Sequence, residues 1–211
     1  MRLSCRWPPA SRRTRRSRLA RLPSASSFPA STARALVRPG CLQRIDPDDG
    51  PRPGEHNSFR GVPLAERDAS TRTAITFLDG TIDAGAATQA WEAALHTPTW
   101  DGPLGWIHGD LLAGNLLIRQ GRLSAVIDFG GLGVGDPACD VMAAWTFLSA
   151  ETREVFRAAV EADDATWARG RGWALSFGLI ALPYYRVSNP VLARIARRAI
   201  DEALADHQRT A

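Results

Sequence analysis

Four polar residues lie close together in a stretch of the sequence that is otherwise mostly apolar. His108 and Asp110 fall in W-I-H-G-D at 106–110, Asn115 ends L-L-A-G-N, and Asp128 lies in L-S-A-V-I-D-F-G. An aspartate, an asparagine later in the same loop, and an Asp-Phe-Gly after the next strand are the parts needed to hold a metal-bound triphosphate beside a hydroxyl. The stretch therefore predicts phosphoryl transfer to an alcohol.

Each side chain suits one requirement of that reaction. A carboxylate beside the acceptor hydroxyl orients it and takes its proton, and Asp110 falls in a loop between two predicted strands, where it can face a cleft. Mg²⁺ prefers hard oxygen ligands, and phosphate and water complete its shell. The amide oxygen of Asn115 and the carboxylate of Asp128 are such ligands at one end of a predicted hairpin, so both can reach one ion.

A small β unit must position these residues. The pattern predicts a short strand at Leu104–His108 and two strands, Asn115–Arg119 and Arg122–Asp128, joined by the turn pair Gln120-Gly121. The glycine-rich run Gly130–Gly135 predicts a flexible loop, since it does not fit the spacing of a phosphate-binding glycine motif.

The remainder of the chain predicts helices. Apolar residues recur at helical spacing, and Asp, Ser or Asn followed by Pro or acidic residues mark several helix starts. The expected fold class is α+β and mostly helical, with two helices before the β unit and four after it. The predicted helices are Pro63–Leu78, Asp83–Thr97, Asp136–Leu148, Ser149–Val160, Asp163–Leu182 and Asn189–Ala205.

The basic charge is confined to the first part of the chain. Residues 1–45 carry 11 arginines and no acid, whereas residues 46–211 carry 15 arginines and 22 acids, a net charge of −7. The first segment is rich in Arg, Ser and Pro and has too little apolar surface to fold, so we expect residues 1–45 to be disordered and 46–211 to form the folded unit. An upstream gene-model artefact, a solvated tail, and a tether to nucleic acid or anionic lipid are alternative explanations of the segment.

Composition excludes several classes of protein. No apolar run of the 211 residues approaches the roughly 18–20 needed to span a bilayer, so no membrane partner is expected. The basic start has no apolar stretch behind it, which argues against a secretory signal. Three widely spaced cysteines fit neither a disulfide framework nor a zinc site, so a cytoplasmic location is expected.

The motifs resemble those of one family. H-G-D-L-L-A-G-N at 108–115, I-D-F-G at 127–130 and G-D-P-A-C-D at 135–140 together resemble the aminoglycoside phosphotransferase family, which has the protein-kinase-like fold. The resemblance extends over about residues 42–207, which correspond to that family's C-terminal lobe. It implies that Asp136 and Asp140 are supporting or structural residues.

The resemblance also implies roles for the first four residues. Asp110 would be the catalytic base, Asn115 and Asp128 would bind Mg²⁺ and through it ATP, and His108 would support the catalytic loop by hydrogen bonding. The implied activity is ATP-dependent phosphorylation of a hydroxyl on a small molecule. The acceptor is an aminoglycoside, which would make the protein an antibiotic-resistance enzyme, or another alcohol such as a macrolide, choline or homoserine. A cationic acceptor would suit the acidic folded unit.

One part of the family's machinery has no counterpart in the sequence. Related enzymes use a lysine on an N-terminal β lobe to contact the nucleotide phosphates, and this chain contains no lysine. We therefore expect the N-terminal lobe to be missing and apolar surface to be exposed where it would dock. A catalytically silent binding or regulatory module is one alternative function. Nucleic-acid binding through the basic segment is a second, disfavoured by the lack of interleaved aromatic residues.

Overall fold

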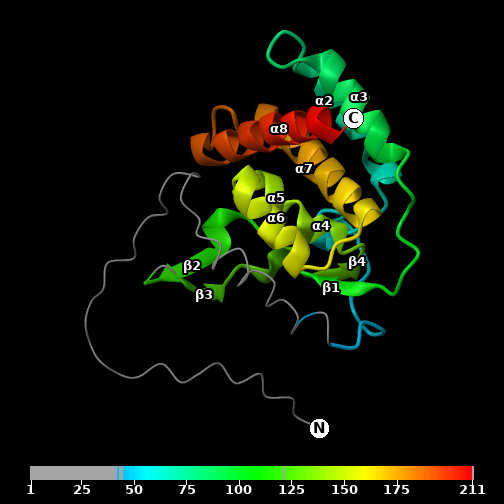
Figure 1. The fold of residues 1–211 in the computed structure, drawn as a ribbon, viewed down its shortest axis with the longest axis vertical. Helices are drawn as coiled ribbons and strands as arrows, with labels where there is room; N and C mark the ends of the chain where they lie inside the picture. The colour runs from blue at the N-terminus through cyan, green and yellow to red at the C-terminus, as the bar shows by residue number, and fades with distance from the viewer. Residues whose placement is uncertain (1–41, 43–44, 121, 211) are drawn as a thin grey trace.

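A computed structural model describes residues 42, 45–120 and 122–210, so that nearly all of the predicted disordered segment lies outside the described residues. The described chain has a body of helices with two small β ribbons at one side (Figure 1). The helices are α2 (Asp68–Phe77), α3 (Ala84–Leu95), α4 (Ala138–Val141), α5 (Ala143–Thr146), α6 (Ala150–Ala159), α7 (Asp164–Tyr185) and α8 (Pro190–Thr210). The strands are β1 (Gly105–Ile107), β2 (Leu116–Arg119), β3 (Arg122–Val126) and β4 (Gly133–Gly135).

Helix α7 is the centre of the helical body. It packs against α8, α4, α3 and α2, and most of its residues are buried on every side. A helix that is apolar all round belongs in a core rather than on a surface. The large indole rings of Trp91 on α3, Trp145 on α5 and Trp173 on α7 itself are fully buried in this core.

Four of the predicted helix starts are confirmed by their caps. The carboxylates of Asp83 and Asp163 accept hydrogen bonds from the third backbone N–H beyond them, and Ser149 does the same within a capping box. Asn189 caps α8 through Leu192 N–H at 3.1 Å. These short polar side chains fix where each helix begins, because they accept hydrogen bonds from N–H groups of the first turn that have no intrahelical partner.

Four predicted helix bounds were wrong. Helix α2 begins at Asp68 rather than at Pro63, because residues 64–67 form a 3-10 helix before it. Helix α7 continues through Pro183 to Tyr185, because a proline close to the helix end removes few intrahelical bonds. The single helix expected over 136–148 is two short helices, α4 and α5, that meet at Met142. Helix α8 extends to Thr210, five residues beyond the predicted end.

The two β ribbons frame the motif-bearing segment. Strands β2 and β3 form the predicted antiparallel hairpin, with Leu116 opposite Val126. The prediction of a flexible loop at 130–135 was wrong: its second half is strand β4, which pairs with β1 and is buried. A Cβ on Gly135 would come within 2.7 Å of the carbonyl oxygen of Gly61, so glycine allows the chain at 61 to lie directly on this strand.

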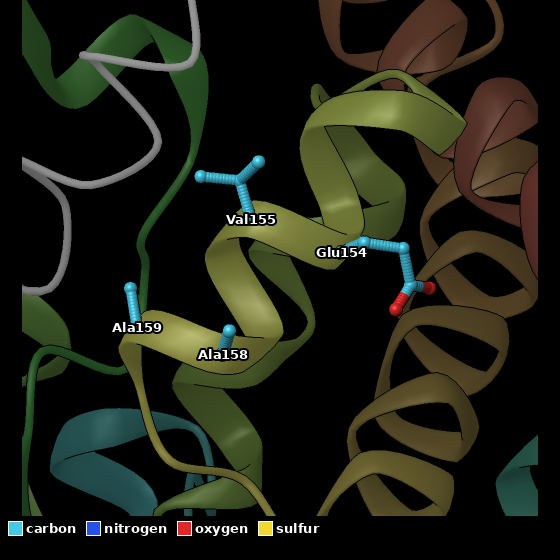
Figure 2. Close-up of a pocket in the computed structure, with 4 residues that line it drawn as sticks. All are labelled: Glu154, Val155, Ala158 and Ala159. Atoms are coloured by element: carbon cyan, nitrogen blue, oxygen red, sulfur yellow. The ribbon is translucent and has the colours of Figure 1, made fainter.

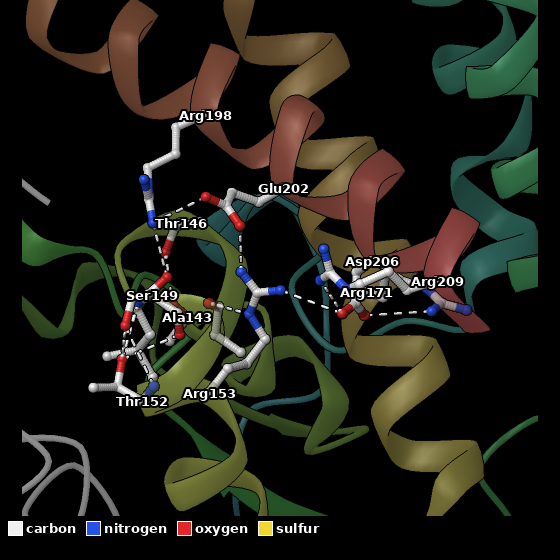
Figure 3. A network of polar contacts seen from close by, with 12 residues as sticks. Ala143, Thr146, Ser149, Thr152, Arg153, Arg171, Arg198, Glu202, Asp206 and Arg209 are labelled. Atoms are coloured by element: carbon white, nitrogen blue, oxygen red, sulfur yellow. Dashed lines mark hydrogen bonds and ion pairs between the residues drawn. The ribbon is translucent and has the colours of Figure 1, made fainter. Parts of the chain in front are cut away.

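A buried arginine joins α6 to α8. Arg153, on α6, is 1% exposed and donates to Glu202 at 2.5 Å, to Asp206 at 3.3 Å and to the carbonyl oxygen of Ala144 at 3.1 Å (Figure 3). Because the two acids lie on α8, this network ties α6 to the C-terminal helix. A buried arginine persists only where such acceptors surround it.

None of the described helices combines the length and the apolar character that crossing a membrane would require.

Candidate functional site

Asp110 is fixed within the loop that joins β1 to β2. The carboxamide of Asn115 donates through Nδ2 to the carbonyl oxygen of Asp110 at 2.8 Å and to its carboxylate Oδ2 at 2.9 Å. Both side chains are half-buried. The bonds leave Oδ1 of Asp110 and the amide oxygen of Asn115 without a partner among the described residues, so both oxygens are available to a ligand.

His108 is buried and serves as a brace between two loops. Its Nδ1 accepts from the backbone N–H of Asp110 at 3.2 Å, and its Nε2 lies 3.0 Å from the carbonyl oxygen of Ile127. The two partners assign the ring proton to Nε2. The ring also packs on Phe129, with centroids 4.7 Å apart. His108 thereby connects the loop of Asp110 to the residues beside Asp128.

Asp140, from α4, holds the same loop through its backbone. Its Oδ2 accepts the backbone N–H of His108 at 2.7 Å, and its Oδ1 accepts that of Gly109 at 2.9 Å. Burial raises the pKa of Asp140, while the two backbone N–H donors and nearby positive charge oppose that rise. The structure therefore places Asp140 as the anchor of the loop rather than as a metal ligand.

Asp128 faces the loop of Asp110 from the end of the hairpin. Its backbone is left-handed, with φ 64° and ψ 69°, and it is exposed. The two loops touch through their backbones: a Cβ on Gly109, whose φ is +76°, would come within 2.2 Å of the carbonyl oxygen of Gly131. This close approach brings Asp110 and Asp128 to the walls of one pocket of about 230 Å³.

The same pocket is lined by residues that the sequence did not single out. Ser58 and Arg60 reach it from the segment that precedes α2, together with His56. Ser58 and Phe59 both have positive φ, 54° and 55°, an uncommon backbone conformation for residues other than glycine. No motif marks this segment; its place at the site follows from its packing against β4, where Asp136 N–H donates to the carbonyl oxygen of Gly61 at 3.0 Å.

Asp136 belongs to the support of the site. Its Oδ1 accepts from Ala138 N–H at 2.9 Å, and its Oδ2 pairs with Nε of Arg169, on α7, at 2.8 Å. Both side chains are about 95% buried, and Arg169 also donates to Thr166 and to the carbonyl oxygen of Pro98. This pair fixes α4, and with it Asp140, on the central helix.

The donor set suits Mg²⁺. Asn115 offers an amide oxygen and Asp128 a carboxylate, which are hard ligands of the kind that Mg²⁺ prefers together with phosphate and water. The two residues are neighbours because Ile127 N–H donates to the carbonyl oxygen of Asn115 at 2.9 Å. Among the described residues no group of three or more His, Cys, Asp or Glu side chains could hold a metal, so an ion here would depend on substrate oxygens as well.

A second hollow, of about 660 Å³, lies on α6 and lacks such chemistry. It is lined by Glu154, Val155, Ala158 and Ala159. Figure 2 shows Val155 and Ala159 on one side of the helix and Glu154 directed to the other. One carboxylate among three aliphatic side chains offers no paired groups for catalysis, so the candidate site is the pocket between Asp110 and Asp128.

Comparisons with solved structures show what the chain resembles. A thermostable mutant of aminoglycoside phosphotransferase APH(4)-Ia, in ternary complex with ADP and hygromycin B, is 21% identical, with a TM-score of 0.53 over 86% of this chain and 68% of that one. Macrolide 2'-phosphotransferase type I is 17% identical, with a TM-score of 0.51 over 82% of this chain and 58% of that one. At such identities the likeness shows the fold alone, which is the protein-kinase-like fold of these enzymes.

The chain spans less than two thirds of the length of two further phosphotransferases of solved structure. The chain covers 62% of the length of APH(2")-IIa in its gentamicin complex and 61% of macrolide 2'-phosphotransferase MphH from Brachybacterium faecium. The curated proteins gave no match.

A family model described as the phosphotransferase enzyme family matches residues 19–173. The match begins within the segment for which the sequence predicts disorder, and it includes both β ribbons, α4 to α6 and the first part of α7. Since it takes in well over half of the sequence, the chain belongs to the phosphotransferase enzyme family.

Proposed function

We propose that this chain carries the catalytic machinery of an ATP-dependent phosphotransferase that acts on a hydroxyl of a small molecule. One observation supports this most strongly: Asp110, held by Asn115, and Asp128 line the same pocket although they are 18 residues apart in sequence. Family membership supports the reaction class. A silent binding module has no chemical need for these three side chains in this arrangement.

Asp110 is the proposed base. Its Oδ2 is occupied by Nδ2 of Asn115, which leaves Oδ1 to accept a hydrogen bond from the acceptor hydroxyl. As the hydroxyl oxygen bonds to the γ-phosphorus and the bond to the ADP oxygen breaks, the hydroxyl proton passes to this carboxylate. The loop is braced by His108 and anchored by Asp140, so the carboxylate is positioned before the substrate arrives.

Asn115 and Asp128 are the proposed ligands of Mg²⁺, through which the phosphates of ATP would be held. When bound, the ion would neutralise the charge that the transferred phosphoryl group carries. Asn115 therefore has two tasks, since its nitrogen orients Asp110 and its oxygen remains for the metal. Exchange of the carboxamide for any apolar group would remove both functions together.

The part of the site that would bind ATP, the phosphoryl donor, needs its own test. The sequence contains no lysine to contact the nucleotide phosphates, and apolar side chains on and beside the β2–β3 hairpin are exposed, namely Leu117, Ile127 and Phe129. Such residues are available to contact an apolar base or a covering segment. Nucleotide binding by this chain is thus a separate question from the arrangement of its catalytic residues.

The experiment measures binding and transfer separately. Purified protein is titrated with MgATP by calorimetry, and ATP consumption is then followed with a panel of aminoglycosides, macrolides and hydroxy acids. We expect MgATP binding and acceptor-dependent ADP release, and we expect Asp110→Asn to keep the first and lose the second by about 10²-fold or more. Absence of both from the wild-type chain would overturn the proposal.

A further inference from the structure

Arg67 ends a 3-10 helix at Leu64–Arg67, and its side chain packs against the central helix α7 in a fixed orientation. Its guanidinium stacks over the ring of Trp173 at 4.5 Å, and its Nε donates to the hydroxyl of Ser176 at 2.9 Å. The hydroxyl of Ser176 is also hydrogen-bonded to that of Thr71, with the two oxygens 2.8 Å apart, so residues of both α2 and α7 hold the arginine side chain in place. The two terminal nitrogens have no partner among the described residues and are not buried atoms, so they remain open to a ligand.

Arg60 lies next to it. Its guanidinium is 5.7 Å from the ring centroid of Phe177, and the residue lines the pocket that contains Asp110. Trp173 and Phe177 are four residues apart on α7, so their rings lie on one face of the helix and one turn from each other. The two guanidinium groups therefore pack one helical turn apart on the same face of α7, and Arg60 extends this face to the lining of the catalytic pocket.

No carboxylate among the described residues forms an ion pair with either arginine. Arg60 lies close enough to Asp140 to lower its pKa, but the two oxygens of that carboxylate already accept the backbone N–H groups of the catalytic loop. Cys139 also faces the pair, but burial raises the pKa of its thiol to about 12, which leaves it uncharged at neutral pH. Burial, and secondarily the charge of Arg60, lowers the pKa of Arg67 to about 10.

Two adjacent positive charges in a half-buried setting are unfavourable unless an anion joins them. We propose that Arg60 and Arg67 form an oxyanion subsite beside Asp110, which binds a carboxylate or phosphate group of the alcohol acceptor. The proposal rests on the proposed function and specifies its substrate class: an acidic small molecule rather than a polycationic one. A guanidinium presents two parallel N–H donors to either kind of oxyanion.

The position of the pair favours the acceptor over the phosphates of ATP as the source of the anion. Both guanidinium groups stack on α7, which packs mainly against other helices. Asn115 and Asp128, which would hold the metal and the nucleotide, belong instead to the β2–β3 hairpin and the turn that follows it. Asp110 shares a pocket with Arg60 and is hydrogen-bonded to Asn115, so a base at this position is close to both sets.

The test uses inorganic phosphate as the oxyanion probe, D-glycerate as a hydroxy acid and glycerol as its neutral match. Binding of each to the whole 211-residue chain is measured by calorimetry, with and without saturating MgADP. The variants are Arg60→Gln and Arg67→Gln, with Arg186→Gln as a control, since Arg186 is exposed at the far end of α7. Arg67→Lys is added because it keeps the charge on Trp173 if the glutamine variant does not fold.

We expect phosphate and glycerate to bind with or without MgADP, glycerol not to bind, and each glutamine variant to raise the Kd for both anions about tenfold or more. Arg67→Lys should weaken the anions less, and Arg186→Gln should leave them unchanged. The MgADP Kd should stay within about twofold in all variants. Phosphate binding in a wild-type chain that binds no nucleotide would uphold the subsite while the proposed function falls.

Three outcomes would overturn the assignment. Failure of the wild-type protein to bind either anion would do so, as would anion binding that is unchanged in the arginine variants. The third is competition between MgATP and phosphate together with a tenfold loss of nucleotide affinity in the arginine variants, since the anion would then be a phosphate of the donor. The proposed function would survive the last two results.

Discussion

Asn115 holds Asp110 at two points, the backbone carbonyl oxygen and the carboxylate Oδ2, at 2.8 and 2.9 Å. A single carboxamide nitrogen thereby fixes both the loop and the side chain. One carboxylate oxygen is left free, and its direction is set by a neighbour rather than by solvent. The orientation of the proposed base is therefore the property most sensitive to substitution at position 115.

Asn115→Ala should lower kcat/KM for phosphoryl transfer by about 10²-fold or more, because a misoriented base and a lost metal oxygen both reduce transfer. Steady-state kinetics and the magnesium dependence of the rate check this. Ser124→Ala, at an exposed position of the same hairpin, is the matched control and should have wild-type kinetics. Equal rates in the two variants would contradict the role given to Asn115.

Gly109→Ala should disrupt the site. The backbone there has φ +76°, and the new methyl group would meet the carbonyl oxygen of Gly131 at 2.2 Å, so the loops of Asp110 and Asp128 must separate. Strained backbone of this kind costs about 1–3 kcal/mol, measurable by urea unfolding. Gly114→Ala, in the same loop with no atom within 4 Å of the added Cβ, should be tolerated. A stable, ligand-binding Gly109→Ala protein would show that the two loops are not packed as described.

Arg169→Ala should destabilise the fold by about 3–5 kcal/mol, because it leaves the buried carboxylate of Asp136 without its positive partner. The free energy of unfolding in urea measures this. Arg197→Ala breaks the exposed pair with Asp201 and should cost about 1 kcal/mol or less. Similar costs for the two variants would mean that the pair of Arg169 and Asp136 is not buried as described.

Asp163 should give α7 a pH-dependent contribution to stability. The backbone N–H and then the hydroxyl of Thr166 lower the pKa of its carboxyl. A lowered folded-state pKa means that the stabilisation is fully present above the ordinary aspartate pKa of about 3.9 and is lost as pH falls through the folded value. Asp163→Ala should therefore cost about 1 kcal/mol at pH 7 and little in strong acid.

Thermal unfolding across pH 2–7 separates the pH-dependent stabilisation by the Asp163 carboxylate from the loss of stability that removal of any exposed carboxylate would cause. Asp101→Ala removes an exposed loop carboxylate and should not change the pH profile relative to wild type. A pH-independent difference between Asp163→Ala and wild type would indicate that the cap acts without its charge.

The parts of the fold that local patterns determine could be predicted from the sequence. The hairpin followed from two short strand-like segments on either side of a turn pair, and the helix starts followed from caps such as Ser149 and Asp163. Strand β4 could not be predicted, since a glycine-rich run has no side-chain period. It is a strand because residues 105–107 and the chain around Gly61 pack against it.

The candidate site divides in the same way. Asp110, Asn115 and Asp128 lie within one short segment, so spacing alone indicated that they act together. Arg60 and Arg67 gave no such signal. Their guanidinium groups pack on Phe177 and Trp173, which lie more than 100 residues away in sequence. Only the packing of α7 against the segment that precedes α2 brings these groups together.

The pairing of β1 with β4 also affects how the site assembles. Ile107 lies opposite Gly133, so the segment 108–132 begins and ends at the same point of the structure. The contacts that set the geometry between the proposed base and the proposed metal ligands thus have low contact order within this excursion, which favours rapid local formation. The contacts of Arg60 with Phe177 and of Arg67 with Trp173, in contrast, join residues more than 100 positions apart, so they have high contact order.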